Sequence, residues 1–289
     1  MSAANTEDAP GRGCPRARDR RGRDLEFLVD LGRAFAGAVI FAMPMLMTME
    51  LWSMGVYVSP SRLLALVVLL MPLLVGLSSV IGFKPTETLR DDVVDAFVAV
   101  AVAAAMSATV LLLFGVVTFD TPAGEAIGRI TLQVIPASIG AMLARSQVSG
   151  EGDGHAEERP SYGRELTFLA VGALFLGLSL APTDEVMLLA YMMGSGQEIA
   201  LALLSLTLMH AFVYTLGFRA GAVPRPGAAF WSVFVRFTVV GYAIVLLIAF
   251  FLLWTFGRTD DTDARVVASC AIVLGFPCAI GAAAARLIL

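Results

Sequence analysis

The same pattern occurs twice in the sequence, as IPASIGAMLAR at residues 135–145 and as FPCAIGAAAAR at residues 276–286. Each copy has a proline, an isoleucine-glycine-alanine triplet and an alanine-arginine pair at the same spacing. Further upstream, an offset of 135 residues aligns Gly37 with Gly172 and Glu50 with Glu185. A match of this specificity predicts that the chain contains a duplicated unit.

The composition excludes an ordinary water-soluble protein. Of the 289 residues, 58% are apolar and 15% are charged, and the mean hydropathy is +0.81, whereas soluble domains carry about 25% charged residues. Three scattered cysteines argue against a disulfide scaffold, and a net charge of −4 argues against binding to nucleic acid. We therefore expect the lipid bilayer to be the solvent and main partner of the chain.

Eight apolar segments reach the roughly 20 residues that a helix needs to cross about 30 Å of hydrocarbon. They predict an all-α membrane protein with eight transmembrane helices in two parallel four-helix repeats, because two halves of four spans enter the membrane in the same orientation. The predicted spans are Leu31–Val56, Arg62–Gly82, Val93–Val117, Ile127–Arg145, Glu165–Met193, Glu198–Gly217, Trp231–Phe256 and Arg265–Leu289. The fourth is the least apolar, and a buried surface helix is the alternative interpretation.

The positive charges predict the orientation, because cytoplasmic loops retain Lys and Arg. Of the twenty Lys and Arg residues, all but Arg62, Arg129, Arg258 and Arg265 fall on one side if both termini are cytoplasmic. Residues 1–30 have many arginines and little apolar sequence, which predicts a disordered basic cytoplasmic tail near anionic headgroups. The remaining predicted parts are a first half at 31–146, a cytoplasmic linker at 147–163 and a second half at 164–289.

Ionisable residues inside spans are candidates for function, because a charge in lipid is costly unless it finds a partner or water. Glu50 and Glu185 occupy matching heights, and they either face each other across a pseudo-twofold axis or belong to separate half-sites. With Asp184, Thr48 and Thr183 they offer the hard oxygen ligands that suit a small cation. The alternative is that these acids are merely hydrated at the outer headgroup level.

Other polar and bent positions within the spans are also candidates. His210 could relay a proton across the membrane or hydrogen-bond to a neighbouring helix. The repeat aligns Asp95 with Arg236 near the inner face, where an ion pair between them would act as a gate or as an anchor. Pro136 and Pro277 each free a helix carbonyl near mid-span, which predicts either a hinge or a packing kink.

The sequence contains none of the common catalytic or cofactor motifs, such as HExxH, GxSxG, a phosphate loop or CxxC. We therefore expect no enzyme, no metal site and no cofactor. The favoured function is a cation channel or secondary transporter that uses the paired carboxylates, and the alternative is a non-transporting accessory or scaffold protein. Small-residue faces on the fourth and eighth spans predict that these helices meet near the axis, and such faces also suit a homo-oligomer contact.

Two stretches, PMLMTMELW at residues 44–52 and IPASIGAMLARSQ at residues 135–147, resemble a family of bacterial integral membrane proteins of unknown function. The resemblance extends from about Arg33 to the C-terminus. It implies a location in the bacterial inner membrane, and it implies neither an activity nor a site.

Overall fold

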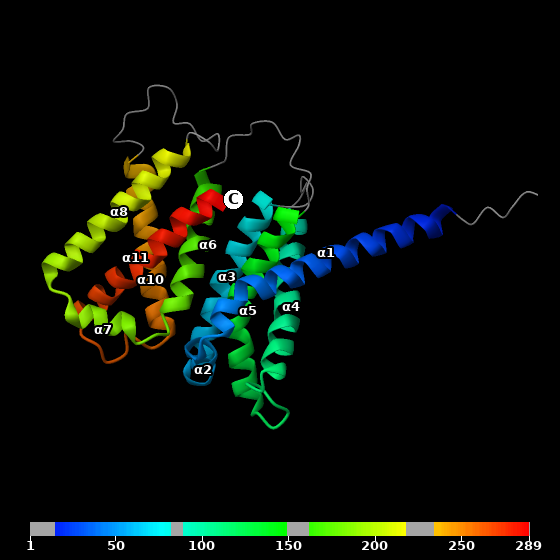
Figure 1. Ribbon diagram of the computed structural model, residues 1–289, viewed down its shortest axis with the longest axis horizontal. Helices are drawn as coiled ribbons and strands as arrows, with labels where there is room; N and C mark the ends of the chain where they lie inside the picture. The colour runs from blue at the N-terminus through cyan, green and yellow to red at the C-terminus, as the bar shows by residue number, and fades with distance from the viewer. Residues whose placement is uncertain (1–14, 82–88, 149–161, 218–233, 289) are drawn as a thin grey trace, which may run out of the picture.

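The computed structural model describes residues 15–81, 89–148, 162–217 and 234–288, and every regular element in these ranges is a helix (Figure 1). The elements before residue 149 are α1 (Pro15–Leu46), α2 (Met49–Tyr57), α3 (Pro60–Ile81), α4 (Leu89–Leu113) and α5 (Ala123–Val148). Those after residue 161 are α6 (Tyr162–Leu180), α7 (Glu185–Met192), α8 (Ser195–Gly217), the π-helix η1 (Phe234–Val239), α10 (Val240–Thr255) and α11 (Ala264–Ile288). The predicted all-α class is confirmed.

Six helices are long and apolar enough to cross a membrane. The candidate spans are Leu28–Leu46, Pro60–Ser79, Leu89–Leu113, Ala123–Ala144, Tyr162–Leu180 and Ala264–Ala285. Helix α10 is apolar but has only 16 residues, and α8, which carries polar residues such as Glu198 and His210, is not among the six. The least apolar predicted span corresponds to α5, whose window is the most enclosed of the six, with 72% buried.

Two of the predicted spans are each divided into a long and a short helix. Leu31–Val56 breaks after Leu46 into α1 and α2, and Glu165–Met193 breaks after Leu180 into α6 and α7. Continuous helices of these lengths would extend to about 40 Å at 1.5 Å per residue, beyond the roughly 30 Å core. The short helices α2 and α7 both lie at the bottom in Figure 1, which we call the α2/α7 end.

A glycine crossing joins α1 to α5 at the centre of the first half. A Cβ atom added to Gly37 would overlap Ala144 and the backbone carbonyl of Gly140, and one added to Gly140 would overlap Phe41. Only glycine permits such a close approach of two helix backbones, and this packing drives helix association in lipid.

The second half contains a crossing with the same spacing. A Cβ atom added to Gly172 of α6 would overlap the Gly281 carbonyl and lie 2.7 Å from Ala285 of α11, and one on Gly281 would lie 3.0 Å from Leu176 Cβ. These four residues are the partners that the two sequence offsets assign to the crossing in the first half. Helix α11 also packs against α7, α8 and α10, as α5 packs against α2, α3 and α4.

The two halves meet mainly where α3 packs against α6, with smaller contacts between α5 and α6 and between α3 and α10. Gly76 of α3 lies against Thr167 of α6 at this interface. The prediction that the fourth and eighth spans meet near a common axis is wrong, because α5 and α11 each form the centre of their own half. Their small residues are used within the halves.

The N-terminal segment differs from its prediction where the structure describes it. Helix α1 begins at Pro15, so residues 15–30 are helical although residues 1–30 were expected to be disordered. Proline fits the first helical position, and arginine is a good helix former. Residues 1–14 and most of the predicted linker at 147–163 lie outside the described residues.

Candidate functional site

The predicted threonines end the two long helices that precede the short ones. The Thr48 hydroxyl donates to the Met45 carbonyl at 3.0 Å, and the Thr183 hydroxyl donates to the Leu180 carbonyl at 2.8 Å. Both bonds join a residue to the carbonyl three positions earlier at a helix end, where carbonyls lack partners within the helix, and the Leu180 carbonyl also accepts from the Thr183 backbone N–H. In this structure the two threonines therefore terminate helices at the α2/α7 end.

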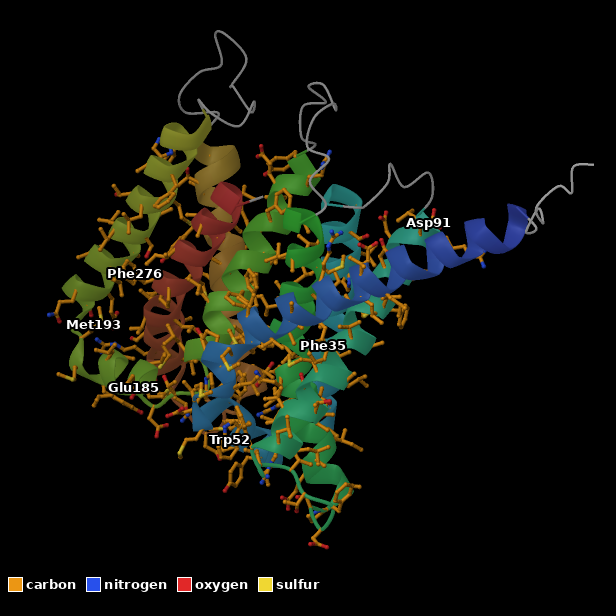
Figure 2. The ribbon with its side chains drawn as sticks, turned by 45° about the vertical axis from the view of Figure 1, so that its right-hand side comes forward. Phe35, Trp52, Asp91, Glu185, Met193 and Phe276 are labelled. Atoms are coloured by element: carbon orange, nitrogen blue, oxygen red, sulfur yellow. The ribbon has the colours of Figure 1, made fainter. Side chains whose placement is uncertain are left out.

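Glu50 and Glu185 lie in the first turns of α2 and α7. Glu50 is half-buried and Glu185 is exposed, and a carboxylate in a first helical turn is stabilised by the helix dipole. Figure 2 shows Glu185 and Trp52 of α2 at the same end of the molecule. Because α2 packs on α5 and α7 packs on α11, the two carboxylates lie on short helices that belong to different halves.

Asp184 is part of an ion pair. Its carboxylate lies 2.7 Å from the Arg258 guanidinium, and 90% of its side chain is exposed. Arg258 also donates to the carbonyl of Pro182. This arginine therefore ties the loop between α6 and α7 to the loop between α10 and α11, an arrangement that the sequence did not reveal.

Another arginine at this end, Arg62, links the first half of the chain to the second. Arg62 of α3 donates to both oxygens of Asp260 at 2.8 and 2.6 Å, and its guanidinium lies 5.2 Å from the ring centre of Trp254. Hydrogen bonding to Arg62 lowers the pKa of Asp260. Gly257, at φ +73°, lies beside this pair, and a Cβ there would be 3.3 Å from Arg62. We call this arrangement the Arg62–Asp260 clamp.

Arg129 of α5 has a comparable environment in the first half. It donates to the Val116 carbonyl, lies 3.5 Å from Glu125 and places its guanidinium 6.0 Å from the ring centre of Trp52. Tryptophan and arginine are common where a protein meets the membrane–water interface. The α2/α7 end thus has the character of a membrane–water interface. The predicted orientation places four arginines on the outer side, and each of them belongs to a helix or loop that extends to this end.

A group of polar residues between helices surrounds His210. Its Nδ1 atom lies 2.8 Å from the Thr238 hydroxyl oxygen, and its ring packs edge-on against Phe234 at 5.0 Å. About one turn away along α10 and α8, the Tyr242 hydroxyl lies near Ser205, although no described residue hydrogen-bonds to it. The Ser205 hydroxyl donates to a backbone carbonyl of α8. These residues bring α8 together with η1 and α10, and we call them the His210 cluster: Ser205, His210, Thr238 and Tyr242.

Of this cluster, only the histidine stands out in the sequence. Ser205 and Thr238 are fully buried and Tyr242 is 8% exposed, although each looks like an isolated polar residue in an apolar run. The available signal was spacing, because Thr238 and Tyr242 are four residues apart and share a helix face. The π-helical turn that positions Thr238 has no evident sequence mark, and such turns are frequent at functional sites.

A fully buried amide lies in the first half. Gln133 of α5 donates from Nε2 to the Ala42 carbonyl at 3.2 Å. Among the described side chains, nothing hydrogen-bonds to its Oε1. Pro136, one turn further on, is buried, and Pro277 of α11 is half-buried. Both prolines lie inside helices that continue past them, and their role as hinges stays a prediction.

The predicted inner ion pair lies partly outside the described residues. Asp95 of α4 is half-buried, and Arg236 falls in η1, but the side chain of Arg236 is not among those described. The neighbouring Asp92 is 5% exposed and accepts a hydrogen bond from Ser78 of α3 at 3.1 Å. Within the described ranges, no three His, Cys, Asp or Glu residues are grouped as a metal site would require.

Comparison with known proteins gives one assignment. No curated protein and no solved structure matches the chain. A family model described as "Putative integral membrane protein (DUF2391)" matches residues 30–289, nearly the whole chain and close to the extent that the sequence resemblance indicated. With its membrane-length helices and this match, the chain belongs to that family of integral membrane proteins.

Proposed function

We propose that the chain is a multi-pass protein of the bacterial inner membrane, formed by duplication of a four-helix unit and oriented with both termini in the cytoplasm. The bounds of the helices support the duplication. Helices α3 and α8 begin at Pro60 and Ser195, at the first offset, and α5 and α11 begin at Ala123 and Ala264, at the second. The two glycine crossings and the two threonine hydrogen bonds also match at these offsets.

The activity we propose is the movement of a cation, with the proton as the favoured species. The observation that carries this proposal is the 2.8 Å contact between His210 Nδ1 and the Thr238 hydroxyl in a buried polar cluster between α8 and η1. Imidazole is the side chain that gains and loses a proton near neutral pH, and polar residues between membrane helices are typical of transport paths. The hydroxyls of Tyr242 and Ser205 extend the cluster further along the same helices.

In this proposal Glu50 and Glu185 have an accessory role. They lie in separate halves at the α2/α7 end, where carboxylates raise the local concentration of cations. The duplicated acids are thus two half-sites at the mouth of the path, and the His210 cluster of the second half is the interior step. We expect no catalytic activity and no bound cofactor.

Proton flux into liposomes that contain the purified protein tests the proposal. We expect the substitution His210→Asn to reduce the flux to the rate of empty liposomes, Thr238→Val to reduce it partly, and Glu50→Gln with Glu185→Gln to reduce it least. Thr207→Val is the matched control, because Thr207 is exposed on the same helix and donates only to a carbonyl of its own helix. Parental flux in the His210→Asn variant would refute the proposal.

The second candidate function is that of a non-transporting accessory or scaffold membrane protein. It is favoured by one observation, namely that Asp184 and Asp260 at the α2/α7 end are held in ion pairs with Arg258 and Arg62. Paired acids strengthen a structure and attract cations less. Equal ion leak in liposomes with and without the parental protein would support this candidate over transport.

A further inference from the structure

The two halves of the chain contact each other through different surfaces. Helices α3 and α5 of the first half meet α6 and α10 of the second. In the proposed repeat, α6 corresponds to α1 and α10 to α4, whereas α3 and α5 correspond to α8 and α11. A head-to-tail contact between related units leaves one copy of each surface uncovered. Those copies are on α8 and on α1 with α4, and Figure 1 shows α8 and α4 at opposite sides of the molecule.

The first uncovered surface is on α1. Thr167 of α6 lies against Gly76 of α3, and Phe175 of α6 packs edge-on at 5.6 Å against Phe41, the α1 residue that itself contacts the second half. The uncovered surface is formed by other residues of α1. The counterpart of Thr167 is Gly32, where an added Cβ would meet no atom of the described residues within 4 Å. The same contrast holds along the helix: Arg164, Thr167, Val171 and Phe175 of α6 are buried or half-buried, whereas their α1 counterparts Val29, Gly32, Ala36 and Ile40 are exposed.

The second uncovered surface is on α8. It consists of the counterparts of the α3 face that carries Arg62 and Gly76, the two α3 residues that contact Asp260 and Thr167 of the second half. On α3, the residues Arg62, Ala65, Leu69 and Gly76 are half-buried, whereas their α8 counterparts Gln197, Ala200, Leu204 and Ala211 are exposed. The two uncovered surfaces are therefore counterparts of two surfaces that already fit each other inside the chain.

We propose that a second copy of this chain covers these surfaces, with α8 of one copy packing on α1 of the next in the register of Gly76 and Thr167. Exposed apolar surface in a membrane needs no partner, since lipid covers it equally well. What favours a second copy is that the internal interface already pairs the equivalent surfaces. The inference rests on the duplicated architecture of the proposed function and does not depend on the proton path.

The proposed contact is heterologous, because it joins two different surfaces, and it therefore leads to a head-to-tail assembly. In a head-to-tail contact each copy uses two different surfaces, and the assembly closes into a ring when the rotation allows it. The smallest ring holds two chains and so four related halves. An isologous dimer, in which α1 meets α1 or α8 meets α8, is a different arrangement and gives a different cross-linking result.

Disulfide cross-linking in membranes tests the contact, in a Cys14→Ser background that leaves only the two buried cysteines of α11. A Cβ on Gly76 would lie 3.5 Å from Thr167 Cβ, which suits a disulfide. The pair Gly76→Cys and Thr167→Cys should therefore form a bond within one chain. Gly32→Cys and Ala211→Cys, placed on separately tagged chains and mixed, should form a bond between the two chains.

The controls separate a specific contact from random collision. Leu203→Cys replaces Ala211→Cys in the matched control, because Leu203 is exposed and its counterpart Val68 also faces outward. We expect Gly32→Cys to cross-link with Ala211→Cys and not with Leu203→Cys, and we expect each single variant alone to remain monomeric on a non-reducing gel. Native mass measurement of the parental protein in nanodiscs should give a discrete mass of two or more chains.

Three results would overturn the proposal. These are a monomeric mass, equal cross-linking at Leu203 and Ala211, and self-cross-linking of a single variant, which would indicate an isologous dimer. Absence of the bond between chains also counts against it when the Gly76 and Thr167 pair forms its bond, because that pair verifies both the internal interface and the oxidation conditions. Failure of that control pair would instead contradict the contact between the halves on which the inference rests.

Discussion

The crossing of α1 with α5 and the crossing of α6 with α11 can be compared residue by residue. In each, a glycine on the first helix meets a glycine on the second, and an alanine one turn further on completes the contact. A larger residue of the first helix, Phe41 or Leu176, covers the second glycine. The polar residues nearby do not match, since Gln133 of α5 stands where α11 has Leu274, and His210 of α8 stands where α3 has Val75.

This difference separates what builds the fold from what distinguishes the halves. Close approach of backbones depends on glycine, because any Cβ would overlap a carbonyl of the other helix. Polar residues are far less constrained by the crossing, so one half can hold a buried amide and the other a histidine cluster. We therefore expect substitutions at the crossings to destabilise the two halves equally, and substitutions of the polar residues to affect the two halves unequally.

The largest expected effect is at the crossings. Gly140→Ala and Gly281→Ala should each destabilise the protein by about 3 kcal/mol, because overpacking against a backbone costs roughly 1–3 kcal/mol and outweighs the helix propensity of alanine. Thermal unfolding in detergent would measure this. Gly163→Ala is the control, because its added Cβ meets nothing within 4 Å in the part of the chain that the structure describes. This substitution should be neutral or stabilising by up to about 1 kcal/mol. A large effect at one crossing and none at the other would break the comparison.

The next largest effect is expected when the residues that differ between α5 and α11 are exchanged. Leu274→Gln should destabilise the second half by about 2 kcal/mol, because a buried amide without partners costs roughly 1–3 kcal/mol. Gln133→Leu should be neutral or stabilising, since it removes an oxygen to which no described side chain hydrogen-bonds. Unfolding by SDS titration measures both. A marked loss of stability in Gln133→Leu would instead indicate that the hydrogen bond to the Ala42 carbonyl holds α1 in place.

Sequence reasoning succeeded where a pattern is local and repeated. The pattern at residues 135–145 and 276–286 identified α5 and α11 as related helices, although these helices do not meet each other as predicted. Of the eight spans that apolar length predicted, six correspond to helices long and apolar enough to cross a membrane, and eight are not confirmed. It failed at Thr48 and Thr183, where two predicted spans each divide into a long and a short helix. Length does not mark these breaks, because α5 continues through 26 residues and α1 through 32.

The candidate site was less predictable, because its contacts join distant parts of the chain. The ion pair between Arg62 and Asp260 spans 198 positions of sequence, and nothing near either residue identifies the other. His210 was visible as a polar residue in an apolar run, but Thr238 becomes its partner only because η1 packs on α8. Residue types can thus indicate candidates, while partners depend on the packing of the helices.

A smaller effect is expected in the His210 cluster. Thr238→Val keeps the shape of the side chain and removes the hydroxyl, and hydrogen bonds between membrane helices contribute on average about 0.6 kcal/mol. A double-mutant cycle of His210→Ala and Thr238→Val should give a coupling of this size. Phe97 occupies the equivalent position in the first half, so the pair Val75→Ala and Phe97→Leu should show no polar coupling. A His210 and Thr238 coupling of zero would contradict the geometry of the cluster.

The smallest effect is expected at the Arg62–Asp260 clamp, because the carboxylate is exposed to solvent and surface ion pairs contribute little. Gln197 is the counterpart of Arg62, so Arg62→Gln makes the first half resemble the second and should lower the unfolding temperature slightly. The pKa of Asp260 is lowered by its hydrogen bonds to Arg62. The stabilisation is therefore complete above the ordinary pKa of an aspartate and is lost as the pH falls through the lowered value.

Unfolding temperatures measured from neutral to acidic pH test this dependence. Asp260→Asn should remove the part of the acid-induced fall in unfolding temperature that the parent owes to this carboxylate. Asp261→Asn, which changes the neighbouring exposed carboxylate, should leave that fall unchanged. The combination of Arg62→Gln with Asp260→Asn should be no less stable than Arg62→Gln alone, because the carboxylate has then already lost its partner. Additive losses would show that the two residues act separately, and the clamp would not be what joins the halves at the α2/α7 end.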